Sequence, residues 1–199
     1  MVFIAIEGGD ASGKSTQARL LSSTLDAVLT REPGGCELGS IIRKILLESC
    51  LTIDPRAEAL LLAASRAQHV SEIIFPSLKE GKIVVTDRFS GSFLAYQGFG
   101  RGLDIEELSW ISSWASKSIE PDLNIFLDIP FEDATKRKSF GSDRFESEKS
   151  QFHHKVIQGY SILAEQDPNR WKKIDGVGTI EQVQQRVLDA YEQWKQNHK

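Results

Sequence analysis

Apolar residues follow two spacings that alternate from one end of the chain to the other. Short apolar runs are typical of strands buried in a parallel sheet, and they lie at residues 2–6, 27–29, 83–86, 123–127 and 171–174. Apolar positions recurring every three or four residues predict helices at residues 16–25, 37–47, 54–78, 104–117, 131–138, 144–166 and 179–194. Because strands alternate with helices, the chain is predicted to be an α/β protein whose parallel sheet is covered on both faces.

Three interruptions refine this prediction. Asp54 followed by Pro55 is typical of a helix start, with an N-cap side chain and a proline in the first turn. Residues 91–102 are rich in glycine, and we expect an irregular loop there. Residues 139–143 break the helical pattern inside a basic stretch, and we interpret residues 136–150 as a short lid.

Composition is that of an ordinary globular protein. The 199 residues, 40% hydrophobic and 26% charged, suffice for one core, so we expect a single domain over residues 1–199. A net charge of −4 argues against a general nucleic-acid or membrane-surface binder. Cys36 and Cys50 form no C-x-x-C pair, and neither a signal-type segment nor a membrane-spanning run is found. We therefore expect a cytoplasmic protein without zinc or disulfides.

The first predicted strand leads directly into a glycine-rich turn. Gly8, Gly13, Lys14 and Ser15 fit Gly-x-x-x-x-Gly-Lys-Ser/Thr between a strand and a helix, which is the setting of a phosphate-binding loop. Main-chain N–H groups and the positive end of the helix would hold a polyphosphate there. Lys14 is expected to bridge the outer phosphates, and Ser15 is expected to ligate Mg²⁺.

A nucleoside triphosphate site leaves the second substrate to be found elsewhere. Asp87 and Arg88 follow a predicted strand, at the sheet edge where parallel sheets bind ligands. The carboxylate of Asp87 suits Mg²⁺ or its water shell, and the guanidinium of Arg88 suits a second phosphate. Arg66, read alone, is more typical of a snorkelling side chain. The basic cluster at 136–144 is as well explained by a solvated surface as by a lid.

These features favour phosphoryl transfer to an acceptor that is itself a phosphate. The second pKa of a monophosphate is about 6, so the attacking oxygen is largely anionic at neutral pH and needs no general base. The lack of Ser-His-Asp and His-Arg-Asp patterns therefore does not argue against this chemistry. What the reaction requires is cations that hold two polyanions in line and a site that excludes water.

Six segments together resemble thymidylate kinases of the bacterial form. They are EGGDASGKST at 7–16, TREPGG at 30–35, SRAQ at 65–68, DRF at 87–89, SFLAYQG at 92–98 and SDRFE at 142–146. The combination is far more specific than the phosphate loop alone, because REPGG and AYQG are hallmarks of that family. The resemblance implies a P-loop NTPase fold of three α/β/α layers with a five-stranded parallel sheet, and a homodimer. The long helix that starts at Asp54 is expected to form part of the dimer surface.

The implied reaction is transfer of the γ-phosphoryl group of ATP to dTMP, which gives dTDP and ADP in dTTP biosynthesis, with Mg²⁺ as cofactor. The residues implied to bind ATP are Gly8, Gly9, Asp10, Ala11, Ser12, Gly13, Lys14, Ser15, Thr16 and Arg137. Those implied to bind dTMP are Asp10, Glu32, Pro33, Leu62, Arg66, Arg88, Ser92, Tyr96 and Gln97. The implied catalytic residues are Lys14, Asp87, Arg88 and Arg144, and the implied metal ligands are Ser15 and Asp87.

Within the dTMP site the resemblance assigns separate contacts. Asp10 would contact the 3′-hydroxyl group of the deoxyribose, and Arg88 would contact the acceptor phosphate. Arg66 and Gln97 would contact the thymine edge, and Ser92 would lie in the base pocket. A polar pocket that pairs each edge of one base rejects analogues that leave a buried group unpaired.

The sequence departs from the family at two positions that bear on function. Ala11 replaces an Arg that some members carry in the phosphate loop, so the catalytic cation is expected from the lid. Arg144 is the first choice for that cation and Arg137 the second, with Arg137 also expected against adenine. Leu62 lies one turn before Arg66, where the family usually has an aromatic side chain that stacks on thymine.

Three other interpretations share some of these features. Another small nucleotide or nucleoside kinase shares the phosphate loop but lacks AYQG. A GTPase-type switch protein requires an Asn-Lys-x-Asp base reader, which this chain lacks. A catalytically silent nucleotide-binding module conflicts with the intact Lys14, Ser15, Asp87 and Arg88. The turn at 175–178, where related kinases receive adenine, leaves ATP and GTP open, and the use of dUMP is open as well.

Overall fold

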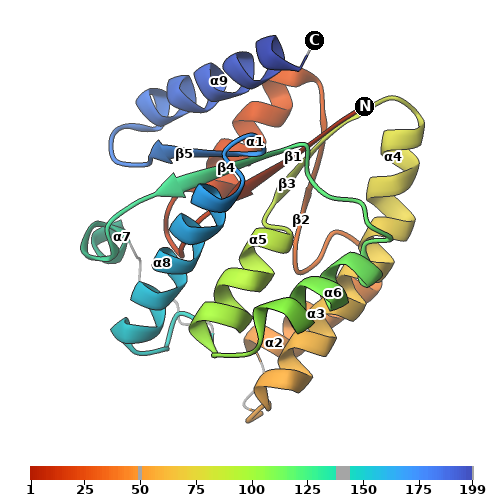
Figure 1. Cartoon of the computed structure of the whole chain (residues 1–199), viewed down its shortest axis with the longest axis vertical. Coiled ribbons are helices and arrows are strands. Elements are labelled where there is room, and N and C mark those ends of the chain that lie inside the picture. Colours follow the sequence, from red (N-terminus) through yellow and green to blue (C-terminus); the bar gives the residue numbers. More distant parts are fainter. Residues whose placement is uncertain (49–50, 138–143, 199) are drawn as a thin grey trace.

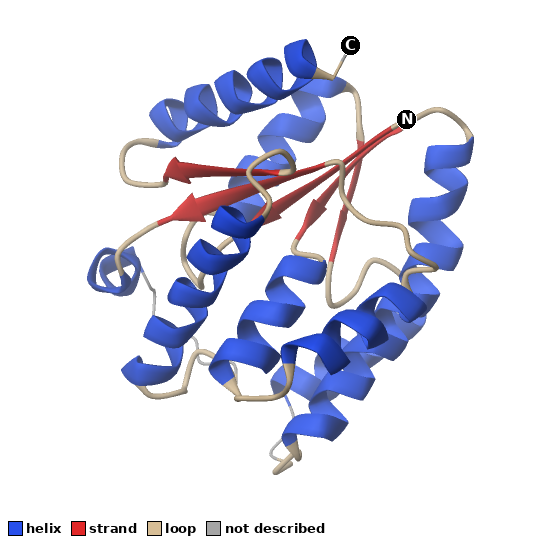
Figure 2. Cartoon of the chain, viewed as in Figure 1, coloured by secondary structure: helices blue, strands red, loops and turns tan. Residues whose placement is uncertain are grey.

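The computed structural model describes residues 1–48, 51–137 and 144–198, which form a five-stranded sheet between two layers of helices (Figures 1 and 2). The strands are β1 (Val2–Glu7), β2 (Val28–Arg31), β3 (Ile83–Asp87), β4 (Leu123–Asp128) and β5 (Trp171–Asp175). All neighbouring strands are parallel, in the order β2-β3-β1-β4-β5. The fold class predicted from the apolar pattern is therefore confirmed.

Helices connect successive strands. They are α1 (Lys14–Leu25), α2 (Glu37–Glu48), α3 (Pro55–His69), the π-helical segment η1 (Val70–Ile74), α4 (Phe75–Lys79), α5 (Ser90–Phe93), the π-helical segment η2 (Leu94–Gly100), α6 (Ile105–Ala115), α7 (Phe131–Arg137), α8 (Ser150–Gln166) and α9 (Ile180–Asn197). The predicted N-cap is present, because Asp54 accepts a hydrogen bond from the backbone N–H of Arg56 at 2.9 Å. Within the described residues, no helix has the length and apolar character needed to cross a bilayer.

Alternating residues of β1 divide the core between the two faces of the sheet. Ile4 and Ile6 pack in one cluster with side chains of α1 and α9. Phe3 and Ala5 pack in another, with Val70 and other residues of η1 and β3. In Figure 1, α9 accordingly lies on one side of the sheet and α5 and α8 on the other. A strand buried on both faces is apolar at successive positions, which explains the unbroken apolar runs.

The glycine-rich segment 91–102 is not the irregular loop that we expected. It is helical over most of its length, as α5 followed by η2. A Cβ on Gly98 would lie 2.1 Å from Cδ1 of Ile105, and one on Gly100 would lie 2.6 Å from Cε2 of Phe152. The glycines therefore allow neighbouring helices to approach η2 closely and do not mark a turn.

Two other predicted helices differ from the structure in detail. The helix predicted at 54–78 consists of α3, η1 and α4 in succession, a π-helical insertion that apolar spacing does not reveal. The helix predicted from Arg144 begins instead at Ser150, because Arg144 and Phe145 lie in turns and extend their side chains towards Glu58 and Tyr96. The predicted break at 139–143 lies outside the described residues, as does part of the predicted lid.

Gly39 allows α2 to approach the loop that follows β2. A Cβ on Gly39 would lie 2.4 Å from the carbonyl oxygen of Gly34, a backbone atom that cannot rotate away. We therefore expect Gly39→Ala to lower the free energy of unfolding by about 1–3 kcal/mol, measured by urea denaturation. Ser40→Ala, at the exposed neighbouring position, is the control. This substitution should change the free energy of unfolding by less than about 0.5 kcal/mol. Equal stabilities of the two variants would contradict the close approach.

Candidate active site

The carboxyl ends of β1, β2 and β3 border a cavity of about 270 Å³. Most of the residues predicted to form a site line it: Asp10, Ala11, Lys14, Ser15, Glu32, Pro33, Leu62, Arg66, Asp87, Arg88, Ser92, Tyr96 and Gln97. The other predicted residues do not line it: Gly8, Gly9, Ser12, Gly13, Thr16, Arg137 and Arg144. The structure thus brings the predicted metal pair and the predicted acceptor residues to one place.

The loop between β1 and α1 has the geometry of an anion cradle. A Cβ on Gly8 would lie 2.8 Å from the carbonyl oxygen of Leu127, so only glycine fits there. Gly13 has a left-handed conformation, with φ of 90°, directly before α1. The Lys14 ammonium group donates to the carbonyl oxygen of Gly9 at 2.5 Å, and burial lowers the pKa of Lys14 to about 8. An anion in the loop would stabilise the charged form of this lysine.

Ser15 and Asp87 form a pair of oxygen donors beside this loop. Ser15 Oγ donates to Asp87 Oδ2 at 2.5 Å. The other carboxylate oxygen, Asp87 Oδ1, is buried and has no hydrogen-bond partner among the described residues. No group of three His, Cys, Asp or Glu side chains able to hold a metal occurs in the described part of the chain. An all-oxygen pair with an unsatisfied carboxylate suits Mg²⁺, which takes one or two protein ligands and completes its shell with water and phosphate.

Arg88 lines the same cavity, beside the phosphate-binding loop. It directly follows β3 with a left-handed backbone, φ of 74°, and its Nη1 atom donates to the carbonyl oxygen of Gly8 at 3.0 Å. Its Nη2 atom donates to Asp10 Oδ1 at 2.6 Å and to the Tyr96 hydroxyl at 3.1 Å. Because a guanidinium is planar, these partners fix its orientation beside the phosphate loop.

A buried cluster supports Arg88 from behind. Ser92 donates to Glu7 Oε2 at 2.5 Å and lies 2.7 Å from the Tyr160 hydroxyl oxygen. The Tyr160 hydroxyl and Ser92 Oγ both accept from Arg88 Nη1, at 3.2 and 3.1 Å. Burial raises the pKa of Glu7, although Ser92 and Arg88 oppose the shift. Ser92 therefore supports Arg88. The predicted place of Ser92 in the base pocket stays a prediction.

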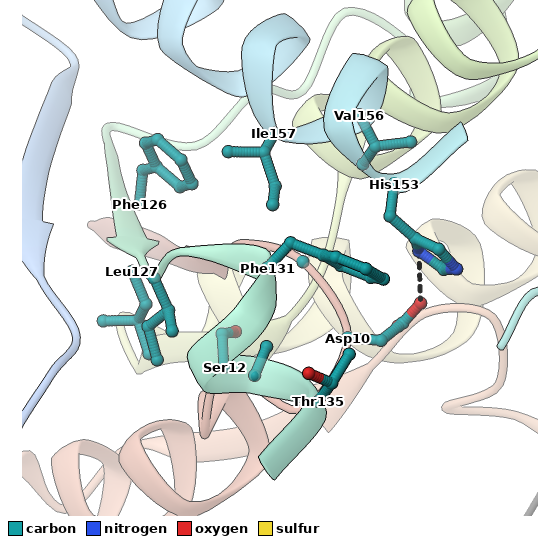
Figure 3. A pocket seen from close by; sticks show the side chains of 12 residues that line it. Asp10, Ser12, Phe126, Leu127, Phe131, Thr135, His153, Val156 and Ile157 are labelled. Atoms are coloured by element: carbon teal, nitrogen blue, oxygen red, sulfur yellow. Dashed lines mark ion pairs between the residues drawn. The ribbon is translucent and has the colours of Figure 1, made fainter. Parts of the chain in front are cut away.

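Asp10 connects the phosphate loop with α8 (Figure 3). Its Oδ2 atom lies 4.0 Å from Nδ1 of His153, the ion pair drawn in Figure 3. The ring of His153 is stacked on Phe131 of α7, with centroids 5.2 Å apart, beside a cavity of only about 20 Å³. Burial alone would raise the pKa of Asp10, but Arg88 and Lys14 lower it. The carboxylate is thus kept charged and is oriented from two sides.

Arg66 is held by charged and polar partners and is not a snorkelling side chain. It donates to Glu32 Oε2 from Nε at 2.9 Å and from Nη2 at 2.7 Å, and it donates to Ser112 Oγ from Nη1 at 2.8 Å. His69 Nδ1 lies 3.0 Å from the other Glu32 oxygen. Burial alone would raise the pKa of Glu32, but Arg66 and His69 lower it. A guanidinium has five N–H donors, so two remain for a ligand.

The two predicted lid arginines occupy different places. Arg144 donates from Nε to the carbonyl oxygen of Leu46 at 2.9 Å and forms an ion pair with Glu58. Arg137 donates to the carbonyl oxygen of Gly176 at 3.2 Å, within the turn predicted to receive adenine. Their catalytic and adenine-binding roles stay predictions.

Sequence reasoning missed six residues of this network: Glu7, Glu58, His69, Ser112, His153 and Tyr160. Glu7 directly follows the first apolar run and Glu58 lies in the first turn of a helix, where acidic side chains are common, so neither stands out in the sequence. His153 and Tyr160 lie on α8 at positions that any amphipathic helix presents to a core, so nothing local distinguishes them.

Two anion sites that share one cavity are what a kinase needs when its acceptor is itself a phosphate ester. The fold and the site therefore define a P-loop nucleotide kinase. Comparison with known proteins narrows this class. The family profile for thymidylate kinase matches residues 6–187, and the chain belongs to the thymidylate kinase family.

Individual relatives agree with the assignment. The chain is 45% identical over 200 residues to the thymidylate kinase of Pelotomaculum thermopropionicum, covering 96% of this chain and 93% of the relative. It is 45% identical over 192 residues to that of Leifsonia xyli, covering 92% and 90%. The crystal structure of thymidylate kinase from Ehrlichia chaffeensis superimposes with a TM-score of 0.81 at 31% identity, covering 94% of this chain and 97% of that one.

The Tyr160 hydroxyl gives a direct test of the cluster behind Arg88. We expect Tyr160→Phe to lower kcat/KM for the monophosphate acceptor about tenfold, because the hydrogen bonds of its hydroxyl to Arg88 and Ser92 are lost. Steady-state kinetics measure the effect. Tyr191→Phe is the control, since Tyr191 is buried in the core cluster of α1 and α9 and does not line the cavity. Unchanged kinetics in Tyr160→Phe would show that the hydroxyl does not support Arg88.

Proposed function

We propose that this thymidylate kinase family member transfers the γ-phosphoryl group of ATP to dTMP in the cavity at the carboxyl edge of the sheet. The products are dTDP and ADP, and the reaction serves dTTP biosynthesis. The observation that carries the proposal is that Lys14 of the phosphate loop and Arg88 line the same cavity. Because a monophosphate acceptor is already anionic, the protein has to bind, align and shield the reactants.

The phosphate loop is proposed to bind the donor. Its backbone N–H groups and the N-terminus of α1 would hold the phosphates, while Lys14 offsets their charge. The proposed ATP contacts are Gly8, Gly9, Asp10, Ala11, Ser12, Gly13, Lys14, Ser15, Thr16 and Arg137. The bond from Arg137 to Gly176 supports an adenine site beside the turn after β5.

Ser15 and Asp87 are the proposed holders of Mg²⁺. Their 2.5 Å contact and the unsatisfied Oδ1 atom of Asp87 support this assignment. When bound, the ion would offset the charge that develops on the transferring phosphoryl group. Ser15 lies at the start of α1 and Asp87 at the end of β3, so both ligands are fixed by regular structure.

The acceptor is proposed to lie against Arg88, which points towards the phosphate loop and would take the phosphate of dTMP. Glu32 and Pro33 line the same part of the cavity. Arg66 has two N–H donors left for the thymine edge, and Gln97 lies in the same wall. The residues proposed to bind dTMP are Asp10, Glu32, Pro33, Leu62, Arg66, Arg88, Ser92, Tyr96 and Gln97.

We further propose that the enzyme is a cytoplasmic, single-domain protein that acts on ATP and dTMP and does not bind nucleic acid. The net charge of −4 and the lack of a C-x-x-C pair support this. The proposed lid at 136–150 includes Arg137 and Arg144, which donate to the carbonyl oxygens of Gly176 and Leu46.

Acceptor choice tests the function directly. With ATP and Mg²⁺, we expect ADP release to be strongest with dTMP when dTMP, dUMP, dCMP, dGMP and UMP are supplied singly. Chelation of the metal by EDTA should abolish turnover. If none of the five acceptors supports ADP release, the proposed function is rejected. If dCMP is turned over at a rate comparable to that of dTMP, thymine selectivity is rejected.

Arg144 is the proposed lid catalyst. We expect Arg144→Ala to lower kcat by about 10²-fold or more, because a cation at the transferring phosphoryl group is lost. The KM for dTMP should change little, because Gln97 keeps its bond to Glu58. Arg137→Ala is the comparison and should mainly raise the KM for ATP. A near-normal kcat in Arg144→Ala would remove Arg144 from the role.

An exposed apolar surface supports the proposed homodimer. Helices α2 and α6 both pack on α3, and the three lie together in Figure 1. Their exposed large apolar side chains are Leu38, Ile41, Ile45, Leu60, Trp110 and Trp114, of which the two tryptophans are 67% and 72% exposed. Exposed large apolar side chains on neighbouring helices are typical of an interface, and a second copy of the chain would cover them.

Trp114 gives the sharpest test of this surface. We expect Trp114→Glu to shift the protein from dimer to monomer in analytical ultracentrifugation, because a charge would be buried at the interface. Phe75→Glu is the control, since Phe75 is also exposed, at 48%, but lies on α4. A wild-type protein that sediments as a monomer would contradict the proposed homodimer.

A further inference from the structure

Glu58 is a buried carboxylate to which no motif assigns a role. It lies on α3, is fully buried, and binds three side chains from two other parts of the chain. Its Oε1 atom accepts from Gln97 Nε2 at 2.9 Å and from Arg101 Nε at 3.1 Å. Its Oε2 atom accepts from Arg101 Nη2 at 3.3 Å and from Arg144. Glu58 itself does not line the cavity, but Gln97 does.

The bond to Glu58 fixes which end of the Gln97 amide faces the cavity. An amide has a donating nitrogen and an accepting oxygen, which look alike until a partner distinguishes them. A carboxylate flanked by two guanidinium groups only accepts, so the nitrogen of Gln97 must face Glu58. The carbonyl oxygen of Gln97 accepts no hydrogen bond from the described residues and is left for a ligand in the cavity.

We propose that Glu58 is a positioning residue that sets base selectivity by holding Gln97 with its acceptor oxygen towards the base. Thymine and uracil carry an N–H donor at ring position 3, which matches this oxygen. Cytosine carries an acceptor at the same position, so two lone pairs would face each other. The inference rests on the proposed function, because it specifies how the dTMP site distinguishes its base.

The surroundings of Glu58 allow it to be changed. Arg101 also donates to Glu148 at 2.5 Å, and Arg144 donates to the carbonyl oxygen of Leu46, so neither guanidinium loses its last partner when Glu58 becomes neutral. Both arginines are partly exposed, at 15% and 19%, and can reach water. A substitution at Glu58 is therefore expected to change the orientation of the Gln97 amide more than the stability of the fold.

The experiment compares dUMP with dCMP, which differ only at the base edge that Gln97 is proposed to read. We expect Glu58→Gln to lower the ratio of kcat/KM for dUMP over dCMP by about tenfold or more, because a glutamine donates as well as accepts and frees Gln97 to turn. The KM for dTMP should rise, whereas any change in kcat would report on Arg144, which also binds Glu58. Calorimetric Kd values for dTMP, dUMP and dCMP should shift in the same sense.

Two further variants make the outcome decisive. Arg101→Lys keeps a cation on Glu58 without touching Gln97, so the dUMP over dCMP ratio should stay at the wild-type value. The double variant Glu58→Gln with Gln97→Glu exchanges the two groups, retains their hydrogen bond and again presents an acceptor-only oxygen to the base. The double variant should restore the dUMP over dCMP ratio that is lowered in Glu58→Gln. Because it preserves the net charge of the pair, it can be used if the single variant does not fold.

The outcomes separate this inference from the proposed function. A wild-type enzyme that does not phosphorylate dTMP would overturn the function itself. Suppose that the wild-type enzyme is active and that Glu58→Gln folds. An unchanged dUMP over dCMP ratio in this variant would then overturn only the role of Glu58. If the single variant does not fold, a low ratio in the exchanged double variant would overturn it in the same way.

Discussion

Arg88 carries a positive charge to the edge of the sheet, where only 17% of its side chain is exposed, and much of the site follows from the need to compensate that charge. Its partners come from the phosphate loop, from α5 with η2, and from α8. Each partner must be brought to the same point by a different connection of the fold. Hydrogen bonds from Arg88, together with its ion pair to Asp10, thus join the phosphate loop to the helices beside it, and the cavity lies where they meet.

The parts of the fold that could be predicted from sequence are those with local causes. A buried parallel strand needs consecutive apolar residues, and a phosphate loop needs glycines at a fixed spacing, so both are visible in one short window. The glycines of 91–102 have a distant cause, because Gly98 and Gly100 make room for Ile105 and Phe152. A local interpretation could only assign them to a loop, and it was wrong.

The same distinction separates the site residues that motifs identify from those that they miss. Lys14, Ser15 and Asp87 were predicted from their places at a helix start or a strand end. Tyr160 contributes only because α8 returns to β1 from the far end of the chain, 153 positions after Glu7. A motif reflects the local sequence of one segment, whereas the hydrogen bonds that support Arg88 depend on how distant segments are folded together.

Leu62 in place of an aromatic side chain bears on affinity more than on selectivity. Every base has a π face, so stacking on an aromatic ring stabilises all pyrimidines alike. Hydrogen-bonding groups at the base edge differ from one pyrimidine to another, and a buried mismatch leaves polar atoms unpaired. Arg66 and Gln97, the residues proposed to read that edge, are held by Glu32 and Glu58, and the Phe93 ring centroid lies 5.2 Å from the Arg66 guanidinium. In the proposed dTMP site, a leucine at 62 would weaken the contact with the face of the base, while the groups proposed to read its edge remain fixed by buried carboxylates.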